Sequence, residues 1–147
     1  MSSRAMWTCD VDGCVKPAEN DIYYALAKEV ERDEINELIA RIDTSALLSI
    51  ASQLRDGVPC SLPQPPEYDE TLVGGMNYHI EIEFEDGVCW MARIRRVNAT
   101  SPSPELRTFI MQSEVATLKF LSKTKIPAPR VFHYDFDPGN PVGVGYI

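Results

Sequence analysis

The sequence lacks both a surplus of positive charge and a long apolar run, and each shortage excludes a class of partner. Its 147 residues carry 14 lysines and arginines against 22 aspartates and glutamates, a formal net charge of -8. Duplex nucleic acid and anionic membrane surfaces bind basic faces, so neither fits as a partner. No apolar stretch reaches the roughly 20 residues that span a bilayer. Residues 1–7 also lack the order of a secretory signal, and we expect a cytoplasmic protein.

Cysteine is sparse, and its spacing does not frame a metal site. The four cysteines stand at positions 9, 14, 60 and 89, and no second Cys or His pair follows at zinc-finger spacing. Reduced thiols are the simpler interpretation. The alternative is a metal site made of Cys9, Asp10, Asp12 and Cys14, although this run lacks the remaining ligands of a calcium loop. We take reduced thiols and assign no metal ligand.

The first half of the chain follows helical spacing and supports a packed core, since 44% of the residues are hydrophobic. We predict one helix from Asn20 through Val30, a second that begins at Asp33, and a third capped by Thr44 and ended near Gly57. Residues 59–69 follow as a proline-rich linker, and residues 59–66 cannot hold a regular ladder or helix. The expected organisation is a helical extension over 1–58, this linker, and a second region over 70–147.

After the linker the hydrophobic period changes from 3.6 to 2. Residues 78–84 alternate, the Glu-Asp-Gly run at 85–87 makes a turn, and residues 88–94 form a second strand, so a β-hairpin is predicted. Ser103 then caps a helix that begins at Pro104, and short strands are predicted over 130–136 and 144–147. The fold class is α+β: helices leading into a small, mainly antiparallel sheet of about five strands with one helix packed across it.

Three features that could carry chemistry occur in order along the chain. Gly74 and Gly75 precede the hairpin, Arg93 lies on its second strand, and Glu114 lies on the following helix. Helical spacing places Glu114 inside the apolar arc, where a carboxylate needs a cation. Alternation places Arg93 on the face opposite the apolar strand residues, and its planar guanidinium can bind a carboxylate or a phosphate.

Each feature also has an ordinary structural interpretation. Glu114 can lie at the edge of the apolar stripe and reach water. Arg93, Arg95 and Arg96 can form a solvated basic edge that protects the strand. Two glycines without the full phosphate-loop pattern also make an ordinary turn. The order of the features is therefore more informative than any one of them.

Short motifs in this order resemble the N-terminal lobe of the aminoglycoside-phosphotransferase-like kinases, and their fungal branch in particular. The motifs are Gly74-Gly75-Met76-Asn77, Phe84-Glu85-Asp86-Gly87, Trp90-Met91-Ala92-Arg93, Glu114-Val115-Ala116-Thr117-Leu118 and Ile126-Pro127-Ala128-Pro129-Arg130-Val131. The resemblance is strong over about residues 54–147 and weaker before them. It implies a kinase-like N-lobe over residues 70–147.

The resemblance also implies a nucleotide-binding set and a cofactor. The implied set is Gly74, Gly75, Asn77, Met91, Arg93 and Glu114. The glycines and the asparagine would lie over the phosphates, and the methionine would line the adenine pocket. The arginine would contact the α and β phosphates and pair with the glutamate. ATP with magnesium is the implied cofactor, and no magnesium ligand is found in this chain.

The departures from the family pattern limit the expected activity. The glycine loop is short, arginine replaces lysine, and the sequence reaches Ile147 without a catalytic loop or a metal-binding aspartate. His79 and His133 are interpreted as structural or exposed. We therefore expect the nucleotide-binding lobe of an ATP-dependent small-molecule phosphotransferase, inactive as this chain alone, with a C-terminal lobe or a protein partner. The alternative is a stand-alone interaction module derived from a truncated kinase, marked by an exposed apolar patch.

Overall fold

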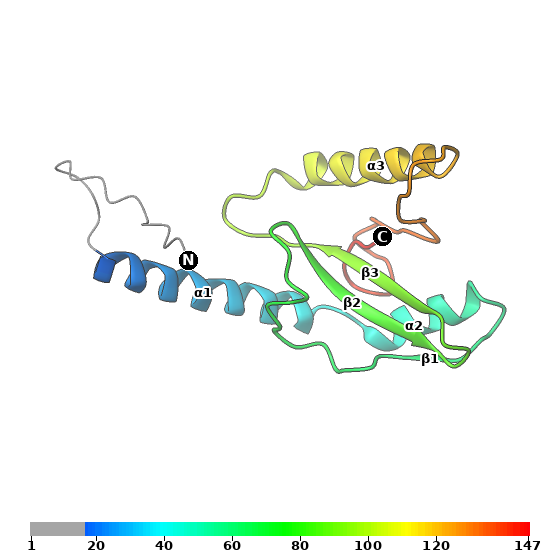
Figure 1. The fold of residues 1–147 in the computed structure, drawn as a ribbon, viewed down its shortest axis with the longest axis horizontal. Helices are drawn as coiled ribbons and strands as arrows, with labels where there is room; N and C mark the ends of the chain where they lie inside the picture. The colour runs from blue at the N-terminus through cyan, green and yellow to red at the C-terminus, as the bar shows by residue number, and fades with distance from the viewer. Residues whose placement is uncertain (1–16) are drawn as a thin grey trace, which may run out of the picture. The chain divides into compact units, whose positions relative to one another are not determined.

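The chain folds as an α+β protein, as the sequence predicts. The structure is a computed structural model that describes residues 17–147, with side chains from Asn20 onward. Its helices are α1 (Pro17–Ala40), α2 (Thr44–Gln53) and α3 (Pro104–Leu121), and its strands are β1 (Cys60–Ser61), β2 (Asn77–Phe84) and β3 (Cys89–Arg95) (Figure 1). The Cys9–Cys14 alternative lies outside the described residues. One compact unit extends to Asp33, and a second extends from Glu34 to Ile147.

The sheet is open and antiparallel, with the strand order β1-β2-β3. The predicted hairpin is confirmed, and its turn contains Gly87 at φ +82°, in the left-handed region that favours glycine. The expectation of about five strands is wrong. Residues 130–136 and 144–147 contribute only isolated bridges, in which Tyr146 pairs with Ile94 on one side and with Asp135 on the other.

Strand β1 lies inside the segment that the sequence assigned to a linker without a ladder. Cys60 pairs with Phe84 and Ser61 pairs with Glu83, while the carbonyl of Pro59 accepts a hydrogen bond from Glu85 N–H at 3.0 Å. The correction has a simple reason. Proline removes only its own N–H donor, and Cys60 and Ser61 keep theirs.

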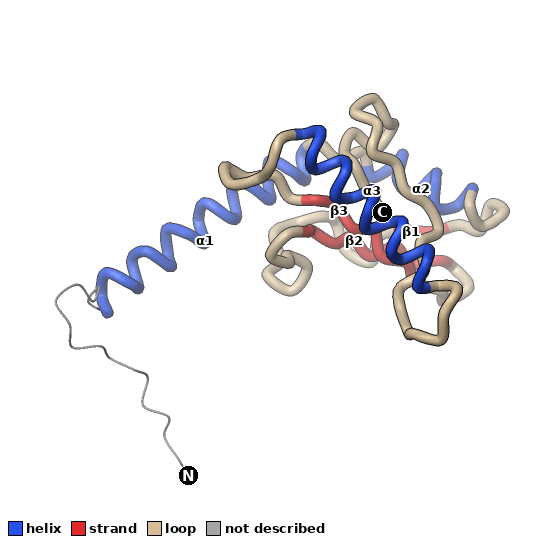
Figure 2. The backbone as a smooth tube through the Cα atoms, turned by 90° about the horizontal axis from the view of Figure 1, so that it is seen from above, coloured by secondary structure: helices blue, strands red, loops and turns tan. Residues whose placement is uncertain are grey.

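The core of the second unit covers one face of the sheet. Its buried members from the sheet are Tyr78, Ile80, Ile82, Phe84, Ala92 and Ile94. They pack with Ile35 and Leu38 of α1 and with Leu47 and Ala51 of α2, and residues 142–146 close the cluster. Figure 2 shows α2 and α3 on different sides of the hairpin. Helix α3 contributes no residue to this core cluster among the described residues.

Two helix boundaries differ from the prediction. The two helices expected from Asn20 and Asp33 form one helix, α1, because no proline or glycine separates them. Asp43, not Thr44, caps α2, and its Oδ1 accepts a hydrogen bond from Ala46 N–H at 2.9 Å. The Ser103 cap is confirmed, with Pro104 in the first turn of α3. Within residues 17–147 no helix has the length and apolarity needed to cross a membrane.

Candidate functional site

Arg93 and Glu114, named from the sequence, form an ion pair between the hairpin and α3. Arg93 Nη2 lies 2.6 Å from Glu114 Oε1, and the two side chains are 27% and 32% exposed. Arg93 lies on the face of β3 opposite the core, because Ala92 and Ile94 on either side of it are buried. The pair therefore joins α3 to the face of the sheet that the core leaves uncovered.

The Gly74–Asn77 turn leaves two backbone donors free. Gly74 N–H donates to Asn77 C=O at 2.7 Å, which closes the turn. Neither Gly74 nor Gly75 has a positive φ, so the turn does not need the conformational freedom of glycine. Within residues 17–147, the N–H groups of Gly75 and Met76 donate to no protein acceptor, and a Cβ at Gly75 would meet no atom within 4 Å. The turn is therefore open to an acceptor from outside.

His79 lies next to both Gly74 and Arg93, although the sequence pattern led us to interpret it as structural or exposed. The hairpin register places His79 directly opposite Arg93. Its Nδ1 lies 3.1 Å from the carbonyl of Leu72, and a carbonyl only accepts, so the proton is on Nδ1. In the neutral ring Nε2 is then an acceptor. Counting residues outward from the turn at Gly87 along both strands pairs His79 with Arg93. Strand alternation was therefore the sequence signal that could have placed His79 beside Arg93.

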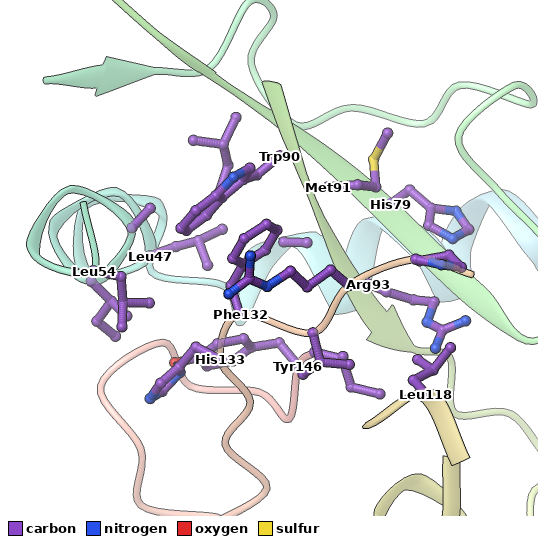
Figure 3. A pocket seen from close by; sticks show the side chains of 18 residues that line it. Leu47, Leu54, His79, Trp90, Met91, Arg93, Leu118, Phe132, His133 and Tyr146 are labelled. Carbon is purple, nitrogen blue, oxygen red and sulfur yellow. The ribbon is translucent and has the colours of Figure 1, made fainter. Parts of the chain in front are cut away.

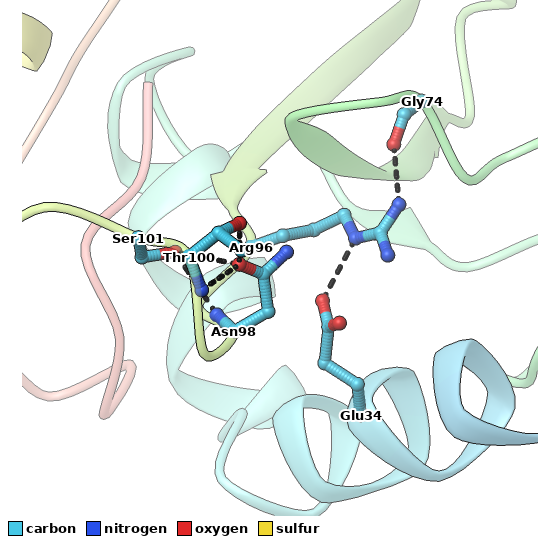
Figure 4. A network of polar contacts seen from close by, with 6 residues as sticks. All are labelled: Glu34, Gly74, Arg96, Asn98, Thr100 and Ser101. Atoms are coloured by element: carbon cyan, nitrogen blue, oxygen red, sulfur yellow. Dashed lines mark hydrogen bonds and ion pairs between the residues drawn. The ribbon is translucent and has the colours of Figure 1, made fainter. Parts of the chain in front are cut away.

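The Arg96 side chain also contacts the Gly74–Asn77 turn, through a hydrogen bond to Gly74 (Figure 4). Its side chain is only 7% exposed. Its Nε lies 2.9 Å from Glu34 Oε1, and its Nη1 donates to the carbonyl of Gly74 at 2.8 Å. The interpretation of Arg96 as part of a solvated basic edge is wrong. The alternation that buries Ala92 and Ile94 continues one step further and places Arg96 on the same core face.

Met91 lies on the same face as Arg93 and is half exposed, 52%. It lines a cavity of about 240 Å³ at the free edge of β3 (Figure 3). Its lining comes from β3, from the segment 129–133, from α2, from Leu118 of α3 and from Ile147. The lining is mainly apolar, as expected of a site for a planar or hydrocarbon group.

The donors at this site suit an anion. Arg93 retains guanidinium hydrogens beyond the one directed at Glu114, and the Gly74–Asn77 turn offers the open N–H groups of Gly75 and Met76. Among residues 17–147, no group of three His, Cys, Asp or Glu side chains is arranged to hold a metal. Guanidinium and backbone N–H donors of this kind are those that bind anionic groups.

Neither described cysteine is prepared for nucleophilic chemistry. Burial raises the pKa of Cys60, whose Sγ lies 3.3 Å from the carbonyl of Leu48. Cys89 is exposed, and slight desolvation together with the neighbouring Glu81 and Glu83 raises its pKa. A thiol with a raised pKa holds its proton at neutral pH, so it is a poor nucleophile.

No protein-family model matches this chain, and neither a curated protein nor a solved structure resembles it significantly.

Proposed function

We propose that residues 70–147 form the nucleotide-binding lobe of an ATP-dependent small-molecule phosphotransferase of the aminoglycoside-phosphotransferase-like type. The observation that carries the proposal is the 2.6 Å ion pair between Arg93 and Glu114. The pair lies on the same side of the hairpin as His79, which adjoins the open Gly74 turn. An arginine fixed by a carboxylate presents its remaining donors in one orientation, as phosphate recognition requires.

The residues of this chain bind and orient, and none of them is assigned a catalytic role. Bound ATP would supply the phosphoryl group. Arg93 would neutralise phosphate charge, the free N–H groups of Gly75 and Met76 would donate to phosphate oxygens, and Met91 would contact the base. A C-terminal lobe, whether covalent or separate, would supply the magnesium ligands and the acceptor site. We expect no phosphoryl transfer by this chain alone.

Calorimetric titration of the intact chain with magnesium ATP tests the proposal. Arg93→Ala should weaken binding by about tenfold or more, because it removes a charge-assisted contact worth roughly 1.5–3 kcal/mol. Glu114→Gln should weaken binding less, since the guanidinium remains but loses its fixed orientation. Arg41→Ala removes an exposed arginine from a different loop and should leave binding unchanged. If the wild type binds no ATP, or Arg93→Ala binds it equally well, the assignment is wrong.

A non-catalytic interaction module is the second candidate, and exposed apolar side chains favour it. The large apolar side chains that α3 and the segment after it leave exposed are Leu106, Phe109, Phe120, Ile126, Phe132 and Tyr134. Exposed apolar side chains that gather into one contiguous patch mark interaction sites on protein surfaces. The two candidates differ in one measurement, because only the first requires that ATP binding depend on Arg93.

A further inference from the structure

His79 and Arg93 form the type of cross-strand pair whose side chains come closest together. The N–H of His79 donates to the carbonyl of Leu72 at 3.0 Å, and the N–H of Arg93 donates to the carbonyl of Ile147 at 2.9 Å. Neither N–H is therefore bonded to the facing strand, so the two residues are a non-hydrogen-bonded pair of the β2–β3 ladder. In such a pair the Cα atoms approach to about 4.5 Å. A group that contacts the remaining guanidinium hydrogens of Arg93 is therefore close to the His79 ring.

A hydrogen bond fixes how the His79 ring is turned. Its Nδ1 lies 3.1 Å from the carbonyl of Leu72, on the side of β2 away from β3. Nε2 is on the opposite edge of the ring, so that edge faces Arg93, and both side chains line the same cavity (Figure 3). Cε1, which is bonded to both ring nitrogens, lies 3.6 Å from the position that a Cβ at Gly74 would take. Nε2 is therefore near both the Gly74–Asn77 turn and Arg93.

The protonation state of the His79 ring decides what Nε2 can bind. In the neutral ring, with its proton on Nδ1, Nε2 is an acceptor and repels an ionised phosphate oxygen, which also accepts. The protonated ring keeps its hydrogen bond to Leu72 and gains a charged N–H donor at Nε2. The ring is half-buried, so it can exchange a proton with water. Histidine is the side chain whose charge ordinarily changes between pH 5 and 8.

The ionisable groups around the His79 ring carry both signs. On the two strands and on α3 they are Glu81, Arg93, Arg95 and Glu114. Across the two cavities that the ring lines they are Glu67, Asp69, Arg130 and His133. Glu114 offsets the charge of Arg93, with which it pairs at 2.6 Å. A bound polyphosphate adds several negative charges beside the ring, and this addition favours the protonated form of the ring.

We propose that His79 is a further phosphate-binding residue of this site and that it binds in its protonated form, so that nucleotide binding takes up a proton from the solvent. The inference rests on the proposed function, because Arg93 and the Gly74–Asn77 turn define where the phosphates lie. The Nε2–H group donates to a phosphate oxygen held by these two elements. Affinity for the nucleotide therefore rises as the pH falls towards about 6, because the complex holds more protons than the separate molecules.

The test is a calorimetric titration of the intact chain with magnesium ATP at about pH 6 and about pH 8, in two buffers of different ionisation enthalpy. The observed enthalpy of a proton-linked reaction depends on the buffer, and this dependence gives the number of protons taken up. We expect a fraction of one proton to be taken up near neutral pH. Binding should be about fivefold tighter at the lower pH.

Two substitutions of His79 separate the roles of its ring nitrogens. His79→Asn places an amide donor near the position of Nδ1, which can keep the hydrogen bond to Leu72, and removes Nε2. Its affinity at the lower pH should fall about fivefold, and its remaining pH dependence should be that of the nucleotide alone. His79→Gln places an amide donor near the position of Nε2 without a titrating group, so it should bind more tightly than His79→Asn and take up no additional proton.

The outcomes separate this inference from the proposed function. A wild type that binds no ATP overturns both. ATP binding that depends on Arg93 but has the same proton uptake in wild type and in His79→Asn overturns the role of His79 alone. Proton NMR of the wild type gives a test without a variant that must bind. The chain has two histidines, and the Cε1–H signal missing from His79→Gln identifies His79. This signal should keep the position of a protonated ring to higher pH with magnesium ATP than without it, and identical titration curves also overturn the role.

Discussion

Replacing Arg96 by alanine measures what a buried ion pair contributes to this fold. The Arg96 and Glu34 side chains are only 7% and 14% exposed, and Arg96 also donates to the Gly74 carbonyl. Without the guanidinium, the Glu34 side chain loses this partner in a largely dry site. We expect Arg96→Ala to lower the free energy of unfolding by about 3–5 kcal/mol, the range found when one partner of a buried pair is removed. This corresponds to a fall of roughly 10–20 °C in Tm.

Urea unfolding of the two single variants and the double variant gives the coupling between Arg96 and Glu34. The matched control is the cycle for Arg55 and Asp86, whose guanidinium and carboxylate lie 2.8 Å apart, with Asp86 in the exposed hairpin turn. Water screens this second pair, so its coupling should be clearly smaller than that of the first.

A double replacement that conserves side-chain volume separates the effect of the buried charges on stability from the effect of packing. Arg96→Met with Glu34→Leu removes both charges and should recover most of the stability lost in Arg96→Ala, because no buried charge is left without a partner. A loss below about 1 kcal/mol for Arg96→Ala would refute the reasoning, because it would mean that water solvates Glu34 in the folded chain.

The backbone and an acidic turn give two further tests. Gly143 has φ +84° and a Cβ there would overlap the Arg41 carbonyl, so Gly143→Ala should lower the free energy of unfolding by about 3 kcal/mol or more. Gly57→Ala, with φ +86° and open space around it, should cost about 1 kcal/mol in the same urea assay, and equal costs would contradict the steric argument. Hydrogen bonds from the N–H and hydroxyl of Thr71 lower the pKa of Asp69 from its ordinary 3.8. The folded chain therefore binds this proton more weakly than the unfolded chain, and the stabilisation is present above pH 3.8 and is lost as the pH falls further. Asp69→Asn should be less stable than wild type at neutral pH and converge with it in acid, and a gap that is constant with pH would exclude the carboxylate as its cause.

Short-range patterns of the sequence predicted much of the second unit. Alternation of polar and apolar residues predicted both hairpin strands and the face that carries Arg93. The Ser-Pro-Glu run at 103–105 predicted where α3 begins. The ion pair between Arg93 and Glu114 was named from a resemblance, and the two side chains are in contact in the structure. Its role in nucleotide binding stays a proposal.

The errors concern partners that are distant along the chain. Cys60 became part of a strand because Phe84, 24 positions later, offers it a backbone to pair with. A surface position for Arg96 stayed open as an alternative because its partner, Glu34, lies on a helix that no sequence pattern connects with the hairpin. Residue propensities and hydrophobic spacing predict the secondary structure of a local segment. They do not predict which distant segment will pack beside it.

The sequence by itself therefore determined the α+β class, the hairpin, its two faces and the start of α3, because side-chain periodicity and capping act within a few residues. The tertiary structure alone decided that Arg96 is buried and that residues 146–147 lie between β3 and Asp135. These features depend on which backbones meet across the fold, and that choice is made by the packing of the whole core.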